Sequence, residues 1–196
     1  MSSIQSIYIK PLQLKEIKAI YKKHARRDFP AAELKPFLLI RRLWNNGCYK
    51  CYGFYEKKDG RLRAYAFTMA EEYTNMLLLD YFAVCENARG KGYGSQALAL
   101  LKETCVKWDG MIVEVEDEDS TEIEEEKTLR RRRVAFYERN GVRMTNEKSV
   151  AFGVDYKLMV LPLGKEAVTE GLGKKLAVIY KRMLPDKVFQ KAFRVR

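Results

Sequence analysis

Hydrophobic residues recur every three or four positions in two segments near the N-terminus. This spacing places the apolar side chains of each segment on one helix face, so it predicts helices over residues 12–26 and 31–46. A short apolar segment before them predicts a first strand at residues 6–10. We expect the second helix to end at Asn46-Gly47, because glycine and asparagine readily adopt the left-handed conformation that commonly terminates a helix.

The middle of the chain has the pattern of strands. Residues 51–57 and 63–71 flank Asp59-Gly60, a dipeptide typical of hairpin turns, and predict two half-buried strands. Residues 75–85 are almost wholly apolar. So short an apolar run between turn residues predicts a central strand that is covered on both faces.

Further along, the pattern changes repeatedly between helix and strand. A helix is predicted from about Ser95, and a strand follows at residues 111–116. An acidic run at residues 114–126, with nine acidic residues and no basic one, then leads into a helix that contains Tyr137. Strands are predicted at residues 142–144 and 150–161. Four apolar residues at helical spacing predict one last helix: Leu172, Leu176, Ile179 and Met183. The fold class is therefore α/β or α+β with a mixed sheet.

Length and charge narrow the class of protein. The 196 residues, of which 47% are hydrophobic, predict one domain, or one domain with a short appendage. No apolar run reaches the roughly 18 residues that span a bilayer, and the first residues lack the pattern of a signal peptide, so we expect a cytoplasmic protein. The net charge of +11 comes mainly from residues 10–27 and 165–196. Such a surplus favours polyanions such as nucleic acid, an acidic membrane surface or a phosphate-rich cofactor, or it only gives a soluble surface.

The four cysteines are Cys48, Cys51, Cys85 and Cys105. Cys48 and Cys51 have the CxxC spacing, but a zinc site needs two more ligands at a similar spacing. A redox motif is expected at a strand-to-helix turn, whereas this pair leads into a predicted strand. We therefore expect free thiols that are buried or half-buried, and no metal site.

The segment Arg89-Gly90-Lys91-Gly92-Tyr93-Gly94 is the most informative motif. It lies between the buried strand and the following helix. Glycines there can leave backbone N–H groups pointing outward at a helix N-terminus, which together with two basic residues forms an anion site. The glycines can also simply shape a surface turn. The spacing differs from that of the Walker loop and of the Rossmann fingerprint.

With a second segment, Val134-Ala135-Phe136-Tyr137-Glu138-Arg139-Asn140-Gly141-Val142, this loop resembles the GNAT N-acetyltransferases. The loop matches the family pattern R/Q-x-x-G-x-G/A, and the later segment is similar to A-x-x-F/L-Y-x-x-x-G-F. The resemblance covers roughly residues 4–162. It implies a mixed, mostly antiparallel sheet with a splayed central parallel strand pair, flanked by helices. We expect an acetyltransferase domain at residues 1–163 and a basic amphipathic helical extension at residues 164–196.

The resemblance also implies acetyl-CoA as the co-substrate, with no metal. In that family the pantetheine arm runs between the two splayed strands, here residues 77–84 and 111–116. Backbone groups of Phe82, Ala83 and Val84 would bind this arm. The pyrophosphate would be bound by Arg89, Gly90, Lys91, Gly92, Tyr93, Gly94 and Ser95. By the family pattern, Tyr137 lies near the sulfur of the cofactor.

Transfer to an amine requires a base, because only the unprotonated amine attacks the thioester. Glu114 matches the position where some family members carry the base; Glu116, Asp80 and a water molecule are the alternatives. Tyr137 would donate a proton to the departing thiolate, or it is only a core aromatic residue. No cysteine has the setting of a nucleophile, so we expect direct transfer in a ternary complex.

The stretch between Glu114 and Tyr137 is longer than is usual in the family and has no asparagine to help bind CoA. The acidic run fills this stretch. It either forms a rim that attracts a cationic amine or pairs with residues 130–133. The rim residues would be Glu116, Asp117, Glu118 and Asp119.

The identity of the acceptor stays open among polyamines, aminoglycosides, small amines and peptide N-termini. Two other functions also stay open. One is an acyl-CoA-binding protein of the same fold without efficient turnover. The other is a nucleic-acid-binding protein that uses the basic ends of the chain, although we find neither aromatic residues interleaved with the basic residues on one face nor a known reading motif. We expect no membrane partner, and the sequence does not indicate an oligomeric state.

Overall fold

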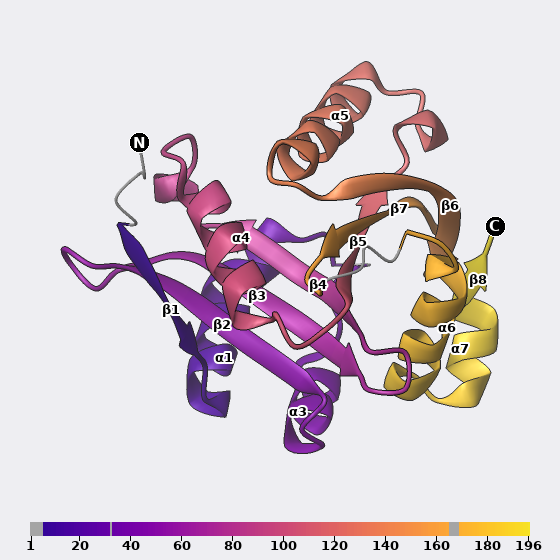
Figure 1. The fold of residues 1–196 in the computed structure, drawn as a ribbon, viewed down its shortest axis with the longest axis horizontal. Coiled ribbons are helices and arrows are strands. Elements are labelled where there is room, and N and C mark those ends of the chain that lie inside the picture. The colour runs from indigo at the N-terminus through magenta and orange to yellow at the C-terminus, as the bar shows by residue number, and fades with distance from the viewer. Residues whose placement is uncertain (1–5, 32, 165–168) are drawn as a thin grey trace. The chain divides into compact units, whose positions relative to one another are not determined.

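The computed structural model describes residues 6–31, 33–164 and 169–196. The chain divides into two compact units, which we call the first unit (residues 1–69 and 80–105) and the second unit (residues 70–79 and 106–196). Figure 1 follows the chain through both units. Parts of three predicted segments lie outside the described residues: residues 4–5, residue 32 and residues 165–168.

The strands belong to one mixed sheet, and its order is β1-β2-β3-β4-β5-β7-β6-β8. The strands are β1 (Ile7–Pro11), β2 (Tyr49–Glu56), β3 (Leu62–Glu71), β4 (Met76–Val84), β5 (Gly110–Glu116), β6 (Arg143–Ala151), β7 (Val154–Pro162) and β8 (Phe193–Val195). β4 and β5 pair in parallel, from Met76 with Gly110 to Leu78 with Ile112. β1 with β2, β2 with β3, β5 with β7, β6 with β7 and β6 with β8 pair antiparallel. This mostly antiparallel sheet with a central parallel pair confirms the predicted fold class.

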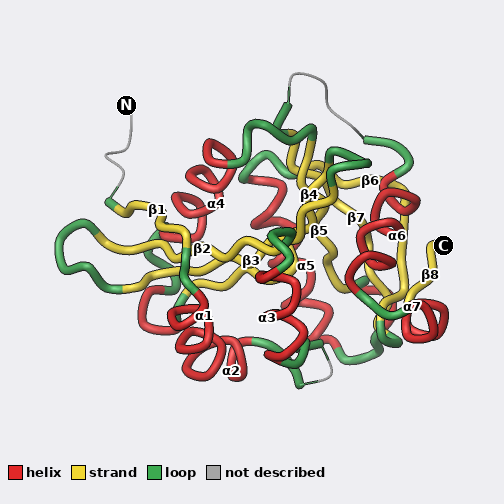
Figure 2. Tube along the Cα trace, turned by 90° about the horizontal axis from the view of Figure 1, so that it is seen from below, coloured by secondary structure: helices red, strands yellow, loops and turns green. Residues whose placement is uncertain are grey.

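In the first unit, helices cover both faces of the strands. Figure 2 shows α4 (Tyr93–Thr104) on one face of β1–β3 and α1 (Leu14–Ile20), α2 (Arg26–Asp28) and α3 (Phe37–Asn45) on the other. The core between these layers is apolar, because alternate strand residues and one stripe of each helix point into it. Its largest fully buried side chains include Ile7, Ile17, Ile40, Tyr49, Phe54, Tyr65 and Phe67.

The two N-terminal helices depart from their predicted extents. The helix predicted over residues 12–26 contains a π-helical segment, η1 (Tyr21–Ala25), between α1 and α2. The second helix begins at Phe37, not at residue 31, because Pro36 is its N-cap. A proline disfavours helical conformation at the residue before it, so the helix starts after Pro36. Similarly, α4 begins at Tyr93, two residues before the predicted Ser95.

In the second unit, α5 (Glu124–Arg139) follows the acidic run as predicted, after a short 3-10 turn, η3 (Glu118–Ser120). The strand predicted over residues 150–161 is wrong, because the chain reverses at Phe152-Gly153 and forms β6 and β7. Phe152 and Gly153 have φ values of 52° and 83°. Two residues with positive φ form the tight turn whose twist suits a β-hairpin.

The C-terminal segment contains more than the one predicted helix. It forms α6 (Leu172–Met183), α7 (Asp186–Ala192) and β8. The predicted apolar stripe of α6 is buried, and Tyr180 joins it. β8 pairs with β6, from Ser149 with Val195 to Ala151 with Phe193. The segment is thus part of the second unit's sheet and core.

All four cysteines are buried, and none of them forms a disulfide. Across the described residues, no helix combines the length and the apolar character that crossing a membrane requires.

Candidate active site

The glycine loop joins β4 to α4 through a short 3-10 turn, η2 (Glu86–Ala88). Gly90 and Gly92 have φ values of 74° and 78°, in the left-handed region where a side chain is strained. Gly92 is the N-cap of α4, and no side chain caps the helix there. The N–H groups of the first helical turn have no intrahelical acceptor, so the loop presents unsatisfied donors.

These donors are accessible and lie among positive charges. Residues 89–92 and Ser95 are exposed, whereas Gly94 is buried under the helix start. The helix dipole adds partial positive charge at this end of α4, and Arg89 and Lys91 add full charges. Lys91 donates to the backbone carbonyl of Asn87 at 3.0 Å, which keeps its ammonium beside the loop. The arrangement therefore fits a phosphate or pyrophosphate group.

Arg89 is held in place by a buried carboxylate. Its Nη2 donates to Oδ1 of Asp28 at 3.1 Å, and its Nε donates to the carbonyl of Val84 at 3.2 Å. The Asp28 side chain is only 2% exposed, and its other oxygen accepts from the Tyr65 hydroxyl at 3.0 Å. The first basic residue of the loop is thus tied to the end of α2 and to β3.

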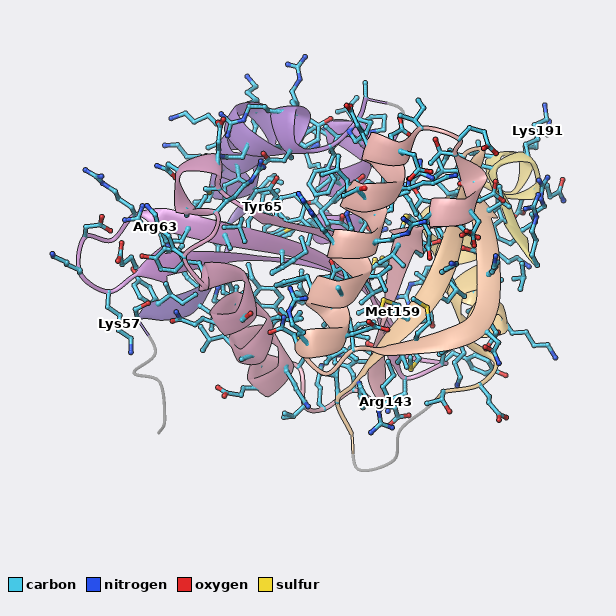
Figure 3. The ribbon with its side chains drawn as sticks, turned by 90° about the horizontal axis from the view of Figure 1, so that it is seen from above. Lys57, Arg63, Tyr65, Arg143, Met159 and Lys191 are labelled. Atoms are coloured by element: carbon cyan, nitrogen blue, oxygen red, sulfur yellow. The ribbon has the colours of Figure 1, made fainter. Side chains whose placement is uncertain are left out.

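Tyr93 anchors the other end of the loop. Its hydroxyl donates to Oε1 of Glu56 at 2.7 Å, and the guanidinium of Arg63 lies 5.7 Å from the centre of its ring. Arg63, labelled with Tyr65 in Figure 3, also donates to Glu56 from its Nε at 2.8 Å. The hydrogen bond from Tyr93, followed by that from Arg63, lowers the pKa of the Glu56 carboxyl. Strands β2 and β3 therefore fix the loop through one ionised carboxylate.

The half-buried end of β4 carries the predicted pantetheine residues Phe82, Ala83 and Val84. Asp80, one of the candidate bases, lies just before them. Its Oδ1 accepts from Lys35 Nζ at 2.6 Å, and its Oδ2 accepts from the Tyr49 hydroxyl. Burial, followed by the charge of Asp80, raises the pKa of Tyr49 well above its usual value. Both oxygens of Asp80 thus have buried partners.

Glu114 lies on β5 in the second unit and is half-buried. Its Oε1 accepts from the Ser149 hydroxyl of β6 at 2.8 Å, and its Oε2 accepts from the Tyr180 hydroxyl of α6 at 2.8 Å. These two hydrogen bonds hold the Glu114 carboxylate from β6 and from α6.

Tyr137 lies on α5 and is 7% exposed. Burial raises the pKa of its hydroxyl to about 12, although the nearby charge of Arg133 opposes this shift. The ring contacts that of Phe136 edge to face, with a centroid separation of 5.3 Å. The hydroxyl consequently keeps its proton at neutral pH and is available as a hydrogen-bond donor.

Each member of the predicted acidic rim has basic partners in the same unit. Glu116 pairs with Arg133 and lies 3.7 Å from Arg130. Asp117 pairs with Lys148 at 2.6 Å and with Lys157 at 3.3 Å. Burial alone would raise the pKa of Asp117, but its hydrogen bonds, first of all the one from Lys148, lower the pKa below its usual value. Lys157 also reaches Glu118 at 2.8 Å and Asp119 at 3.3 Å. The pairing alternative thus describes Glu116, whereas the other three carboxylates share two lysines and keep a net negative charge.

The predicted site residues therefore form two groups. The loop, the end of β4 and Asp80 belong to the first unit, whereas Glu114, Tyr137 and the acidic rim belong to the second. The residues that support them were not predicted from the sequence: Asp28, Tyr65, Glu56, Arg63, Ser149 and Tyr180. Ser149 and Tyr180 lie 35 and 66 positions from Glu114, Glu56 lies 37 positions from Tyr93, and Asp28 lies 61 positions from Arg89. No short motif could have indicated contacts over such separations.

The model of the family described as "Acetyltransferase (GNAT) family" matches residues 17–152, more than half of the chain. The chain belongs to the GNAT acetyltransferase family. The resemblance inferred from the two motifs is thereby confirmed, and the protein is a GNAT-type N-acetyltransferase by family and by fold. The C-terminal segment from α6 onward lies beyond the matched residues.

Several solved structures share this GNAT fold. A putative acetyltransferase from Bacteroides thetaiotaomicron has a TM-score of 0.68 and 19% identity, covering 88% of this chain and 97% of that one. The ribosomal-protein-S18-alanine N-acetyltransferase of Escherichia coli has a TM-score of 0.58 and 18% identity, and the match covers 82% of this chain and 96% of that one. The spermidine N-acetyltransferase of Vibrio cholerae, in complex with CoA and spermine, has a TM-score of 0.60 and 12% identity, and the match covers 81% of this chain and 96% of that one. No curated protein sequence matches the chain.

Within the described residues, no group of three or more His, Cys, Asp or Glu side chains is arranged to hold a metal ion.

The ion pair of Lys35 with Asp80 yields a first prediction. Their side chains are 6% and 4% exposed, so Asp80→Asn leaves a buried ammonium without its counter-charge. We expect this variant to lower the free energy of unfolding by about 3–5 kcal/mol, measured by urea denaturation. The matched control is Glu16→Gln in the exposed Lys10–Glu16 pair, with side chains 50% and 33% exposed, which should cost at most about 1 kcal/mol. Equal stability of the two variants would contradict a structural role for Asp80.

Proposed function

We propose that this chain transfers an acetyl group from acetyl-CoA to an amine acceptor by direct transfer in a ternary complex. The observation that carries the proposal is the glycine loop. Its uncapped helix start, its two left-handed glycines and its exposed basic residues suit the pyrophosphate of a coenzyme. The CoA held by the Vibrio cholerae relative supports the same cofactor.

The cofactor would be bound by residues of the first unit. The pyrophosphate is assigned to the loop residues Arg89, Gly90, Lys91, Gly92, Tyr93, Gly94 and Ser95. The pantetheine arm is assigned to the backbone of Phe82, Ala83 and Val84. Because Asp28 and Glu56 already fix Arg89 and Tyr93, the loop does not have to be ordered when the cofactor binds, which favours affinity.

Glu114 is assigned the role of general base. A protonated amine cannot attack a carbonyl, so a carboxylate must take up its proton, directly or through a water molecule. The new C–N bond then forms as the C–S bond breaks. Tyr137 is assigned to the departing sulfur, because its hydroxyl stays protonated at neutral pH and can donate to the developing negative charge.

The acceptor is assigned to the class of cationic amines, which includes polyamines and peptide N-termini. The relatives named above act on an alanine of ribosomal protein S18 and on spermidine. The acidic rim would attract such a cation, with Asp119 the most accessible member at 73% side-chain exposure. A panel of amines assayed for CoA release identifies the acceptor.

The cofactor assignment predicts a loss of binding in Gly92→Asp, which places a side chain and a negative charge among the loop donors. Acetyl-CoA should raise the melting temperature of the unmodified chain, because a ligand that binds only the folded state stabilises it. The variant should lose this shift. Gly60→Asp is the matched control, since Gly60 also has a positive φ, 67°, in an exposed turn. The absence of any shift and of calorimetric binding at millimolar acetyl-CoA would refute the proposal.

The role of Tyr137 predicts a slow Tyr137→Phe variant. The change removes one hydroxyl and keeps the ring, so kcat should fall by roughly 10²–10⁴ while the affinity for acetyl-CoA stays the same. Steady-state kinetics and calorimetry measure the two quantities. Tyr73→Phe is the control, because Tyr73 is 89% exposed. A Tyr137→Phe enzyme within a few-fold of the parent would leave Tyr137 as a packing residue.

The acidic rim is tested by the joint variant Glu116→Gln, Asp117→Asn, Glu118→Gln and Asp119→Asn. We expect a higher KM for a cationic acceptor, an effect that shrinks as salt rises, and an unchanged KM for acetyl-CoA. The control neutralises Glu122, Glu124 and Glu125, exposed acids of the same run. A loss of stability with an unchanged acceptor KM would instead assign the rim to its pairs with Arg130, Arg133, Lys148 and Lys157.

A further inference from the structure

The Tyr180 hydroxyl connects the C-terminal segment to the candidate base. Tyr180 lies on α6, beyond the residues that match the family model, and donates to Oε2 of Glu114 at 2.8 Å. Ser149 donates to the other oxygen at 2.8 Å. Tyr180 is 4% exposed and Ser149 is fully buried, so water does not compete freely for either hydroxyl.

Several contacts fix α6 and therefore the position of Tyr180. Glu147 of β6 accepts from the N–H groups of Leu172 and Gly173 at 2.9 and 2.8 Å, which holds the start of the helix. Arg182 pairs with Glu71 at 3.1 Å. The ring of Tyr180 stacks on that of Phe193 in β8, with centroids 4.4 Å apart and planes at 20°.

Charged groups on these elements have partners of their own. Glu116, two residues beyond Glu114 on β5, pairs with Arg133. Glu147 caps α6, and Arg182 pairs with Glu71. The hydroxyls of Ser149 and Tyr180 both donate directly to the Glu114 oxygens.

We propose that Tyr180 is a positioning residue for the reaction: with Ser149 it orients the Glu114 carboxylate and stabilises its ionised form. This inference rests on the proposed function, in which Glu114 is the base. Hydrogen bonds donated to a carboxylate favour its charged form, and two donors on different oxygens fix the plane of the group. The C-terminal segment is on this account part of the catalytic machinery of this chain.

The decisive variant is Tyr180→Phe, which removes one hydroxyl and keeps the ring on Phe193. Two measurements are compared: the titration midpoint of the Glu114 carboxyl, followed by carbon-13 NMR of glutamate-labelled protein, and the acid limb of the pH profile of kcat/KM. Both should move to higher pH together, by roughly 0.5–1 pH unit, with an unchanged KM for acetyl-CoA. Ser149→Ala should move both in the same direction and provides the second test should Tyr180→Phe fold poorly.

Phe189→Leu is the matched control, because it removes a ring that stacks on Phe193 at a centroid distance of 5.8 Å and leaves Tyr180, its stacking partner Phe193 and both hydroxyls in place. It should lower the melting temperature without moving the midpoint or the acid limb. A midpoint that moves while the acid limb stays fixed would give Tyr180 a structural role only and overturn the inference. An unmoved midpoint would overturn it as well. Lack of turnover in the unmodified chain would instead refute the proposed function, and the catalytic role of the pair with it.

Discussion

An α-helix cannot satisfy the N–H groups of its own first turn, and the start of α4 leaves this deficit open. A serine or aspartate at the N-cap would fill it from within the chain. Gly92 has no side chain to cap the helix, and its φ of 78° lies in the left-handed region that favours glycine. The surrounding residues fix the loop rather than cover it: Asp28 holds Arg89, and Glu56 holds Tyr93. An anion bound at this point, as proposed for the pyrophosphate of acetyl-CoA, would accept hydrogen bonds from these donors.

Local patterns in the sequence predicted most of the fold. The spacing of apolar residues gave the helices, and the run ending near Val84 gave the central strand beside the glycine loop. The errors arose where one residue outweighed the pattern. Pro36 delayed α3 by several residues, and Phe152-Gly153 formed a hairpin turn although phenylalanine rarely takes a positive φ.

The candidate site was predictable only in its motif residues. Gly90 and Gly92 could be identified from the sequence because their proposed role depends on their own backbone conformation. Asp28 and Tyr180 are not, because each acts through a partner that folding brings close from more than 60 positions away. The charged residues show a similar contrast. The acidic run is plain in the sequence, but the pairing of Asp117 with Lys148 of β6 and Lys157 of β7 depends on the β6–β7 hairpin. Side-chain networks that span several elements therefore need coordinates.

Strand β8 has a further consequence for how the protein behaves in a crowded solution. A bare sheet edge presents unpaired N–H and C=O groups that can recruit a strand from another molecule. β8 covers the end of β6 over Ser149–Ala151 with only three residues, and the exposed residues there include Arg194 and Arg196. A short strand flanked by like charges is a poor template for further pairing. Loss of β8 would therefore expose part of β6 and favour edge-to-edge aggregation, even where the rest of the second unit stays folded.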